Sequence, residues 1–207
     1  MNSDTQTEST GKAAIFRSVS PEGNWKSLRY TSPATRRVPQ NVPLLVDNLW
    51  EWRRPEGFPN RRFSAFASPT AALASKSAPG GVVCRAVLKG TFSLCQLKGW
   101  TDSKFHPECK SLPKLLAAKL GSTWTNAPLD HKQEVGRLWM PCLTKAEVQS
   151  LFETVDTLKS IRQEIEESVT YWKSVVKIAS LDCMIDIEGE LFFEAPEGYE
   201  LIRVENG

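Results

Sequence analysis

Hydrophobic and polar positions alternate along the chain in a pattern that predicts strands and helices in an irregular order. Short apolar runs, several of them bounded by Gly or Pro, predict strands at 13–19, 63–67, 82–88, 91–97, 182–187, 190–194 and 199–204. Segments with helical spacing lie between the strands at 13–19 and 63–67, and again between the strands at 91–97 and 182–187. The order favours an α+β fold over a regular βαβ array.

Two short helices are predicted in the first half of the chain. Asn41 is expected to cap a helix that has Pro43 in its first turn and ends near Arg54. Ser68 is expected to cap a second helix over 70–76.

The clearest helical pattern lies in the second half of the chain. Thr144 and Glu147 have the Thr-x-x-Glu spacing of a capping box. Apolar residues then recur every three or four positions, at Val148, Leu151, Val155, Leu158, Ile161, Ile165, Val169, Trp172 and Val176. This spacing predicts one long amphipathic helix, or two with a break, up to about residue 179. Its apolar face is expected to pack in the core or to dock a partner protein. A shorter helix is expected over 112–120.

Composition excludes several classes of protein. No apolar run approaches the roughly 18 residues that span a bilayer, and residues 1–12 lack the basic start and apolar core of a secretion signal. We therefore expect a cytoplasmic protein without membrane association, whose first 12 residues are disordered. The five cysteines include no Cys-x-x-Cys pair, and His106 with Cys109 has no second ligand pair, so we expect neither a disulfide framework nor a metal site.

The charge is near neutral in sum but uneven along the chain. The formal net charge of +2 argues against a polyelectrolyte such as a DNA coat protein. Residues 1–62 are basic, and the arginine pairs 36–37, 53–54 and 61–62 are interleaved with tryptophan and phenylalanine. Arginines among aromatic residues suit phosphate contact and base stacking, although such pairs also occur as plain solvated surface. The sequence contains no GxGxxG or Walker phosphate loop.

Two carboxylates mark the start of the C-terminal strand pair. Glu188 and Glu190 stand two residues apart and are expected on the same side of a strand. An apolar strand, the turn Pro196-Glu197-Gly198 and a second strand follow. This arrangement resembles the Glu-x-Glu hairpin of ADP-ribosyltransferases, in which the second glutamate is catalytic. The resemblance makes Glu190 the candidate catalytic residue.

Two further patches fit the same family. Ile15-Phe16-Arg17 is similar to its first strand, in which an arginine follows an aromatic residue. Residues 63–74 resemble its middle motif, a strand that ends in serine or threonine and leads into an alanine-rich helix, with Ser64 or Ser68 at the serine position. The order of the three patches resembles the arginine–serine–glutamate branch.

The resemblance implies a fold and a set of roles. The fold would be a split pair of mixed or antiparallel sheets with flanking helices, in one catalytic domain over 13–207 with a helical insertion at 98–180. NAD would be the substrate, without a metal. Glu190 would hold the ribose 2′-hydroxyl and offset the positive charge of an oxocarbenium-like transition state. Glu188 would orient or deprotonate the acceptor.

The remaining site residues would hold the cofactor. Arg17 would grip the pyrophosphate, because its guanidinium presents a planar fork of donors. The serine of the middle motif, Ser64 or Ser68, would brace Glu190 or contact the nicotinamide ribose.

The resulting hypothesis is a mono-ADP-ribosyltransferase that modifies a macromolecule: RNA, DNA or protein. A small cytosolic enzyme of this kind resembles the toxin of a bacterial toxin–antitoxin or phage-defence module, and an antitoxin would then dock on the long helix or the tail. Two alternatives stay open. One is an NAD glycohydrolase with water as the acceptor, and the other is a non-enzymatic α+β module that binds nucleic acid or protein.

Overall fold

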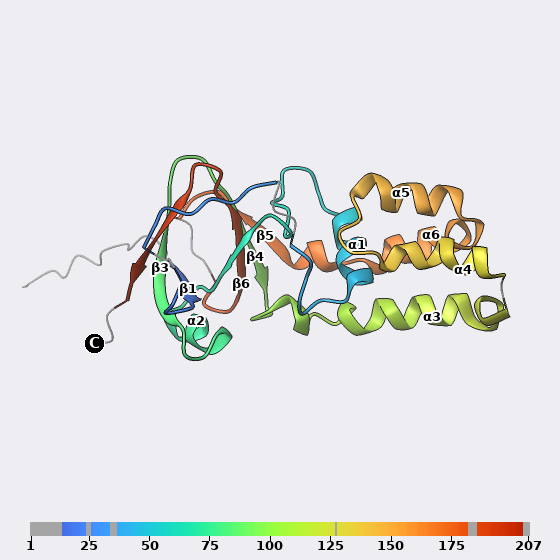
Figure 1. Ribbon diagram of the computed structural model, residues 1–207, viewed down its shortest axis with the longest axis horizontal. Helices are drawn as coiled ribbons and strands as arrows, with labels where there is room; N and C mark the ends of the chain where they lie inside the picture. Colours follow the sequence, from blue (N-terminus) through green and yellow to red (C-terminus); the bar gives the residue numbers. More distant parts are fainter. Residues whose placement is uncertain (1–13, 24–25, 34–36, 127, 182–185, 205–207) are drawn as a thin grey trace, which may run out of the picture.

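The strands gather at one end of the molecule and most helices at the other, with α1 (Leu44–Trp52) between them (Figure 1). The computed structural model describes residues 14–23, 26–33, 37–126, 128–181 and 186–204. All strand pairs in it are antiparallel, and the helices form a layer of their own. The fold is therefore α+β, as predicted.

The seven strands form two sheets. The first has the order β1-β3-β7, formed by β1 (Ile15–Val19), β3 (Val82–Leu88) and β7 (Tyr199–Arg203). The second has the order β2-β6-β4-β5, formed by β2 (Ala65–Ala67), β6 (Gly189–Glu194), β4 (Ser93–Lys98) and β5 (Val175–Ile178). The chain crosses from one sheet to the other between β6 and β7, so these two strands do not pair and the expected C-terminal hairpin is not formed.

The second sheet is buried on both faces. Leu191 and Phe193 of β6 pack toward the first sheet, in a core shared with Ile15 and Leu201. Phe192, between them, packs on the opposite face against the helices. This alternation is the period-2 pattern of a strand, and it explains why β6 reads as a continuous apolar run in the sequence.

The helical layer covers the outer face of the second sheet. It comprises α1, α3 (Glu108–Asn126), α4 (Leu129–Gly136), α5 (Lys145–Thr154) and α6 (Asp156–Ser168). Three short 3-10 helices adjoin it, η1 (Ser103–Phe105), η2 (Arg137–Trp139) and η3 (Tyr171–Ser174). The last helix, α2 (Ala71–Ser77), packs instead on β1 and β3 of the first sheet. Leu45, Leu49 and Trp50 of α1 lie at the centre of the helical core.

The predicted long helix is two helices with a break, and it ends earlier than expected. The capping box of Thr144 and Glu147 is present at the start of α5. Val155 has an extended backbone and separates α5 from α6, which ends at Ser168. The continuation to residue 179 is wrong, because η3 and then β5 follow. The β-branched pair Val175-Val176 favours a strand, and β5 pairs with β4.

The caps predicted for the two short helices, Asn41 and Ser68, are both wrong. Pro43 itself occupies the N-cap position of α1, where no side chain caps the helix. Thr70, and not Ser68, caps α2, because its hydroxyl accepts a hydrogen bond of 3.2 Å from the Leu73 amide. The backbone of Ser68 instead exchanges hydrogen bonds with Phe16 of β1.

Two predictions fall wholly or largely outside the described residues. These are the disordered segment 1–12 and the strand at 182–187, of which only residues 186 and 187 are described and lie in no strand. The segment 98–180 contains α3, α4, α5 and α6, and it also supplies β5 to the second sheet.

Candidate functional site

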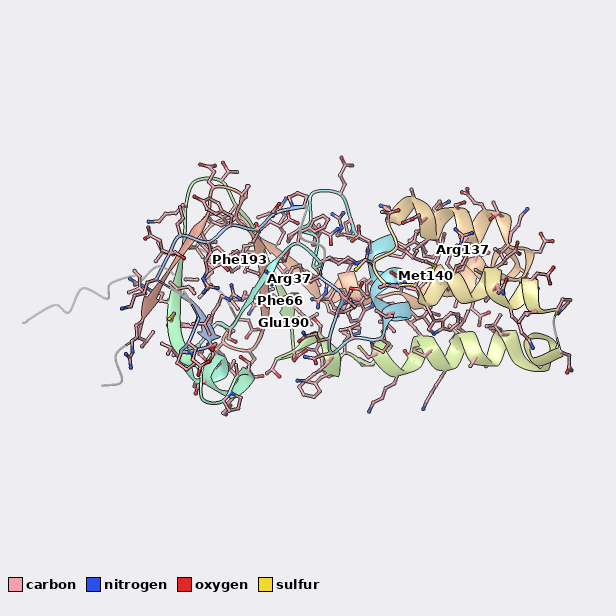
Figure 2. The ribbon with its side chains drawn as sticks, in the orientation of Figure 1. Arg37, Phe66, Arg137, Met140, Glu190 and Phe193 are labelled. Atoms are coloured by element: carbon pink, nitrogen blue, oxygen red, sulfur yellow. The ribbon has the colours of Figure 1, made fainter. Side chains whose placement is uncertain are left out.

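A pocket of about 590 Å³ lies where the second sheet meets the helical layer. Glu190 lies in its wall, with Arg37 and Phe66 close by in the middle of the molecule (Figure 2). The wall also includes Asp47, Arg61, Arg62, Ser77, Asp102 and residues 38–42. The volume falls in the range of small-molecule sites, and the wall combines apolar with charged groups as such sites do.

One oxygen of the Glu190 carboxylate is held in place by two residues. Oε2 accepts hydrogen bonds from Arg61 Nη1 at 3.2 Å, from the Ser103 amide at 3.3 Å and from the Ser103 hydroxyl. No described residue donates a hydrogen bond to the other oxygen, Oε1. The carboxylate is thus oriented by protein groups on one side, while its second oxygen is free to accept a hydrogen bond from a ligand.

Arg61 is the counter-charge of Glu190 and is enclosed by aromatic rings. Its guanidinium carbon lies 5.0 Å to 5.6 Å from the ring centroids of Trp50, Phe66, Tyr171 and Phe192. Burial alone would lower the pKa of Arg61, but Tyr171 and Glu190 outweigh it and raise that pKa above its ordinary value. Arg61 therefore stays charged beside Glu190.

Tyr171 fixes Arg61 from the helical side. Its hydroxyl accepts a hydrogen bond of 2.7 Å from Arg61 Nη1, and its ring stacks on Trp50 at a centroid distance of 3.9 Å. Burial raises the pKa of Tyr171, although the positive charge of Arg61 acts in the opposite direction, so the phenol is neutral at physiological pH. Trp50 in turn donates a hydrogen bond of 2.8 Å to the buried Glu108.

Glu188 lies outside this pocket. Its side chain is exposed and is not part of the pocket wall. Gly189, between the two glutamates, has φ +131°, a conformation that side-chain-bearing residues rarely adopt. The strand alternation that places residues two apart on the same side therefore begins only at Gly189, and the expected pairing of the two carboxylates is not formed.

Arg17 contacts Tyr199 and not Glu190. Its guanidinium donates a hydrogen bond to the Tyr199 hydroxyl and lies 5.5 Å from that ring. Burial lowers the pKa of Arg17; Tyr199 opposes this, and the positive charges of Arg29 and Arg37 add to the lowering. Arg37 is in the pocket wall, whereas Arg17 is not, although the two positive charges are close enough to act on each other.

Neither candidate serine reaches Glu190. The buried Ser64 hydroxyl donates a hydrogen bond of 2.8 Å to the Asn60 carbonyl. Ser68 joins β1 through its backbone. Ser103, which lies in the segment 98–180 and was not among the predicted site residues, is the serine that contacts Glu190.

Four of the six arginines expected on a nucleic-acid surface form ion pairs within the protein: Arg53, Arg54, Arg61 and Arg62. Arg54 forms an ion pair with Glu51 at 3.0 Å, and Arg61 and Arg62 are held by Glu190 and Asp47. Arg62 ties α1 to the loop before α5, since it also bonds the Asn48 side chain and the Leu143 carbonyl. Trp50 and Trp52 are buried.

No protein-family model, curated protein or solved structure matches the chain. Within the described ranges, no three His, Cys, Asp or Glu side chains come together as a metal site requires. No helix in the described part of the chain is both long and apolar enough to cross a membrane.

Proposed function

We propose that this protein cleaves the nicotinamide–ribose bond of NAD and transfers ADP-ribose to a macromolecule. The observation that carries the proposal is the state of Glu190. Its carboxylate is oriented through Oε2 by Arg61 and Ser103, while Oε1 has no partner among the described residues, in the wall of a pocket of about 590 Å³. Such a preoriented negative charge stabilises a cation that forms beside it.

The reaction needs little more than this charge and a place for the phosphates. The bond between ribose C1′ and the nicotinamide nitrogen breaks, and nicotinamide leaves with the electron pair as a neutral molecule. The ribose becomes oxocarbenium-like, Glu190 offsets its positive charge, and an acceptor nucleophile forms the new bond to C1′ and loses a proton. Arg37 in the wall, with the charge of Arg17 near it, would attract the pyrophosphate.

Strand pairing supports the proposal independently of the pocket. β2, which carries the middle patch, pairs with β6, which carries Glu190. β1, which carries Arg17, meets the middle patch through the antiparallel bridge between Phe16 and Ser68. The three patches of the resemblance, which are far apart in sequence, thus belong to strands that are joined by hydrogen bonding.

Nicotinamide release from NAD is the direct test. The wild-type protein is expected to release nicotinamide and to melt at a higher temperature with NAD present. Glu190→Gln keeps the shape of the side chain and removes its charge, so it is expected to lower the rate by about 10²- to 10³-fold. Free ADP-ribose without a labelled macromolecule would identify water as the acceptor. A wild-type protein that neither releases nicotinamide nor is stabilised by NAD would refute the proposal.

Glu188 provides a second, separable test. The resemblance implies that this residue acts on the acceptor and not on NAD, and its exposed position outside the pocket is compatible with that role. Glu188→Gln is expected to transfer ADP-ribose to the macromolecule about 10²-fold more slowly, while nicotinamide release continues at the wild-type rate because water takes the ADP-ribosyl group and free ADP-ribose is formed. If nicotinamide release fell as far as in Glu190→Gln, a separate acceptor role for Glu188 would be wrong.

A further inference from the structure

One surface beside the pocket carries positive charge that few described groups neutralise. It consists of Lys104, Phe105, Lys110 and Lys114, and we call it the α3 lysine face. Lys110 and Lys114 are exposed and form no ion pair with any described residue, while Lys104 pairs with Asp102 at 3.0 Å. Phe105 is 57% exposed, and the Lys104 ammonium lies 4.9 Å from the centroid of its ring.

The face begins at the candidate site and leads away from it. Asp102 is in the pocket wall and Ser103 holds Glu190, so Lys104 and Phe105 directly follow two residues of the site. α3 then runs from the sheets along the outer edge of the helical layer (Figure 1). Lys110 and Lys114 are one turn apart, or about 6 Å along the axis, and lie opposite the buried side of the helix.

On the α3 part of this face the exposed charge is positive. The acidic residue of α3 itself, Glu108, is buried and hydrogen-bonded to Trp50 and Thr170. The groove on α6 differs in this respect, because Arg162 there pairs with Glu166 at 2.9 Å. A polyanion therefore gains more from the α3 lysine face than from the other charged groove.

We propose that the acceptor is a single-stranded nucleic acid whose backbone binds the α3 lysine face, with a base stacked on Phe105. This inference rests on the proposed function and names the substrate class of the same site. Lysines along a helix suit a row of phosphates, and an exposed aromatic ring suits an unpaired base. A base in a duplex is already stacked on its neighbours and is not free to stack on Phe105 or to enter the pocket.

Binding of a fluorescent single-stranded oligonucleotide to the full chain tests this without NAD. The two unpaired lysines, Lys110 and Lys114, predict that log Kd changes with log salt with a slope of about 1.4, so raising salt from 50 to 200 mM weakens binding about 7-fold. The triple variant Lys104→Gln/Lys110→Gln/Lys114→Gln is expected to lose most of that slope and at least 10-fold in affinity at 100 mM salt. Phe105→Ala is expected to weaken binding about 10-fold with the slope unchanged.

Lys119→Gln is the matched control. Lys119 lies on the same helix but is paired with Glu164 at 2.7 Å, so its loss is expected to leave the slope within experimental error. Unchanged binding by the triple variant, or an equal loss with Lys119→Gln, would overturn the inference. So would ADP-ribose label that is lost on protease treatment but survives nuclease. Absence of nicotinamide release would refute the proposed function, whereas the salt slope would still report on the surface.

Discussion

The buried pair of Arg61 and Glu190 allows a quantitative test of how the site is held. Their side chains are only 11% and 13% exposed, and their charged atoms are 3.2 Å apart. Replacing Arg61 by Met keeps similar bulk among the rings but leaves Glu190 as a buried charge without its partner. Breaking a buried pair in this way costs about 3–5 kcal/mol, so we expect Arg61→Met to lower the free energy of unfolding by about 4 kcal/mol.

The second variant of the cycle removes the other charge. Glu190→Gln keeps an oxygen that accepts from Ser103 and leaves Arg61 with Tyr171, so we expect it to cost about 2 kcal/mol. In the double variant no unpaired charge remains, and its cost should be about 4 rather than 6 kcal/mol. The coupling free energy is then about 2 kcal/mol, which is well above the roughly 0.5 kcal/mol expected of independent sites.

Urea unfolding followed by circular dichroism measures all four proteins. With a typical slope of about 2 kcal/mol per molar urea, the coupling corresponds to a midpoint difference of about 1 M. The four proteins must have the same slope, because a changed slope would mean a changed unfolded or native state. Additive costs of the two substitutions would refute the view that Arg61 and Glu190 form one electrostatic unit.

Further predictions concern single residues. Gly189→Ala should lower the free energy of unfolding in urea by about 3 kcal/mol or more, because the new Cβ would lie 2.4 Å from the Leu97 carbonyl oxygen and the backbone has φ +131°. Gly136→Ala is the control: Gly136 has open space around it in α4, so this change should be neutral or stabilising. Burial of His106 lowers its pKa from 6.5, so the unfolded chain takes up the proton more readily and stability should fall as the pH drops below about 6.5. His106→Gln should show a smaller fall in urea midpoint between pH 7.5 and 5.5; an equal fall would contradict this. Burial raises the pKa of Cys95 to about 12, so iodoacetamide at pH 8 should label it only after unfolding, as peptide mass spectrometry would show.

Local patterns were sufficient to predict most of the strands. β3 has the predicted bounds, and β6 and β7 each differ from theirs by one residue at one end. Short apolar runs next to turns that contain Pro and Gly define these segments, and no tertiary contact is needed to find them. The predicted end of the long helix was wrong because Val169, Trp172 and Val176 keep helical spacing by coincidence. Pairing with β4 decides the conformation of Val176, which lies in β5.

The site was only partly predictable, because its members depend on pairing between distant segments. Glu190 was found through its own local motif. Its partners Arg61, Ser103 and Tyr171 lie 129, 87 and 19 positions away along the chain and have no motif of their own. Arg61 had a visible signal, an arginine pair directly before a strand, but the same signal is typical of solvated surface. A buried and a solvated arginine pair look the same in the sequence. The pairing of β2 with β6, which brings Arg61 to Glu190, is what makes Arg61 buried.

The charge imbalance along the sequence now has a structural explanation. The acidic C-terminal strands do not act together on a ligand, because Glu194 accepts from the Asn60 amide, Glu200 pairs with Lys89 at 2.9 Å, and Glu190 pairs with Arg61.

Arginines of the basic segment 1–62 also form internal ion pairs. Arg61 pairs with Glu190 of β6 and Arg62 pairs with Asp47 of α1, so these pairs hold the loop before β2 to both elements. Two groups of positive charge remain beside the pocket: Arg37 in its wall and the α3 lysine face. The pocket wall also contains Glu190, whose Oε1 has no partner among the described residues. The proposed transfer of ADP-ribose from NAD to a polyanion would use these charges in two ways, with the cations attracting the two anionic substrates and Glu190 offsetting the positive charge that forms between them.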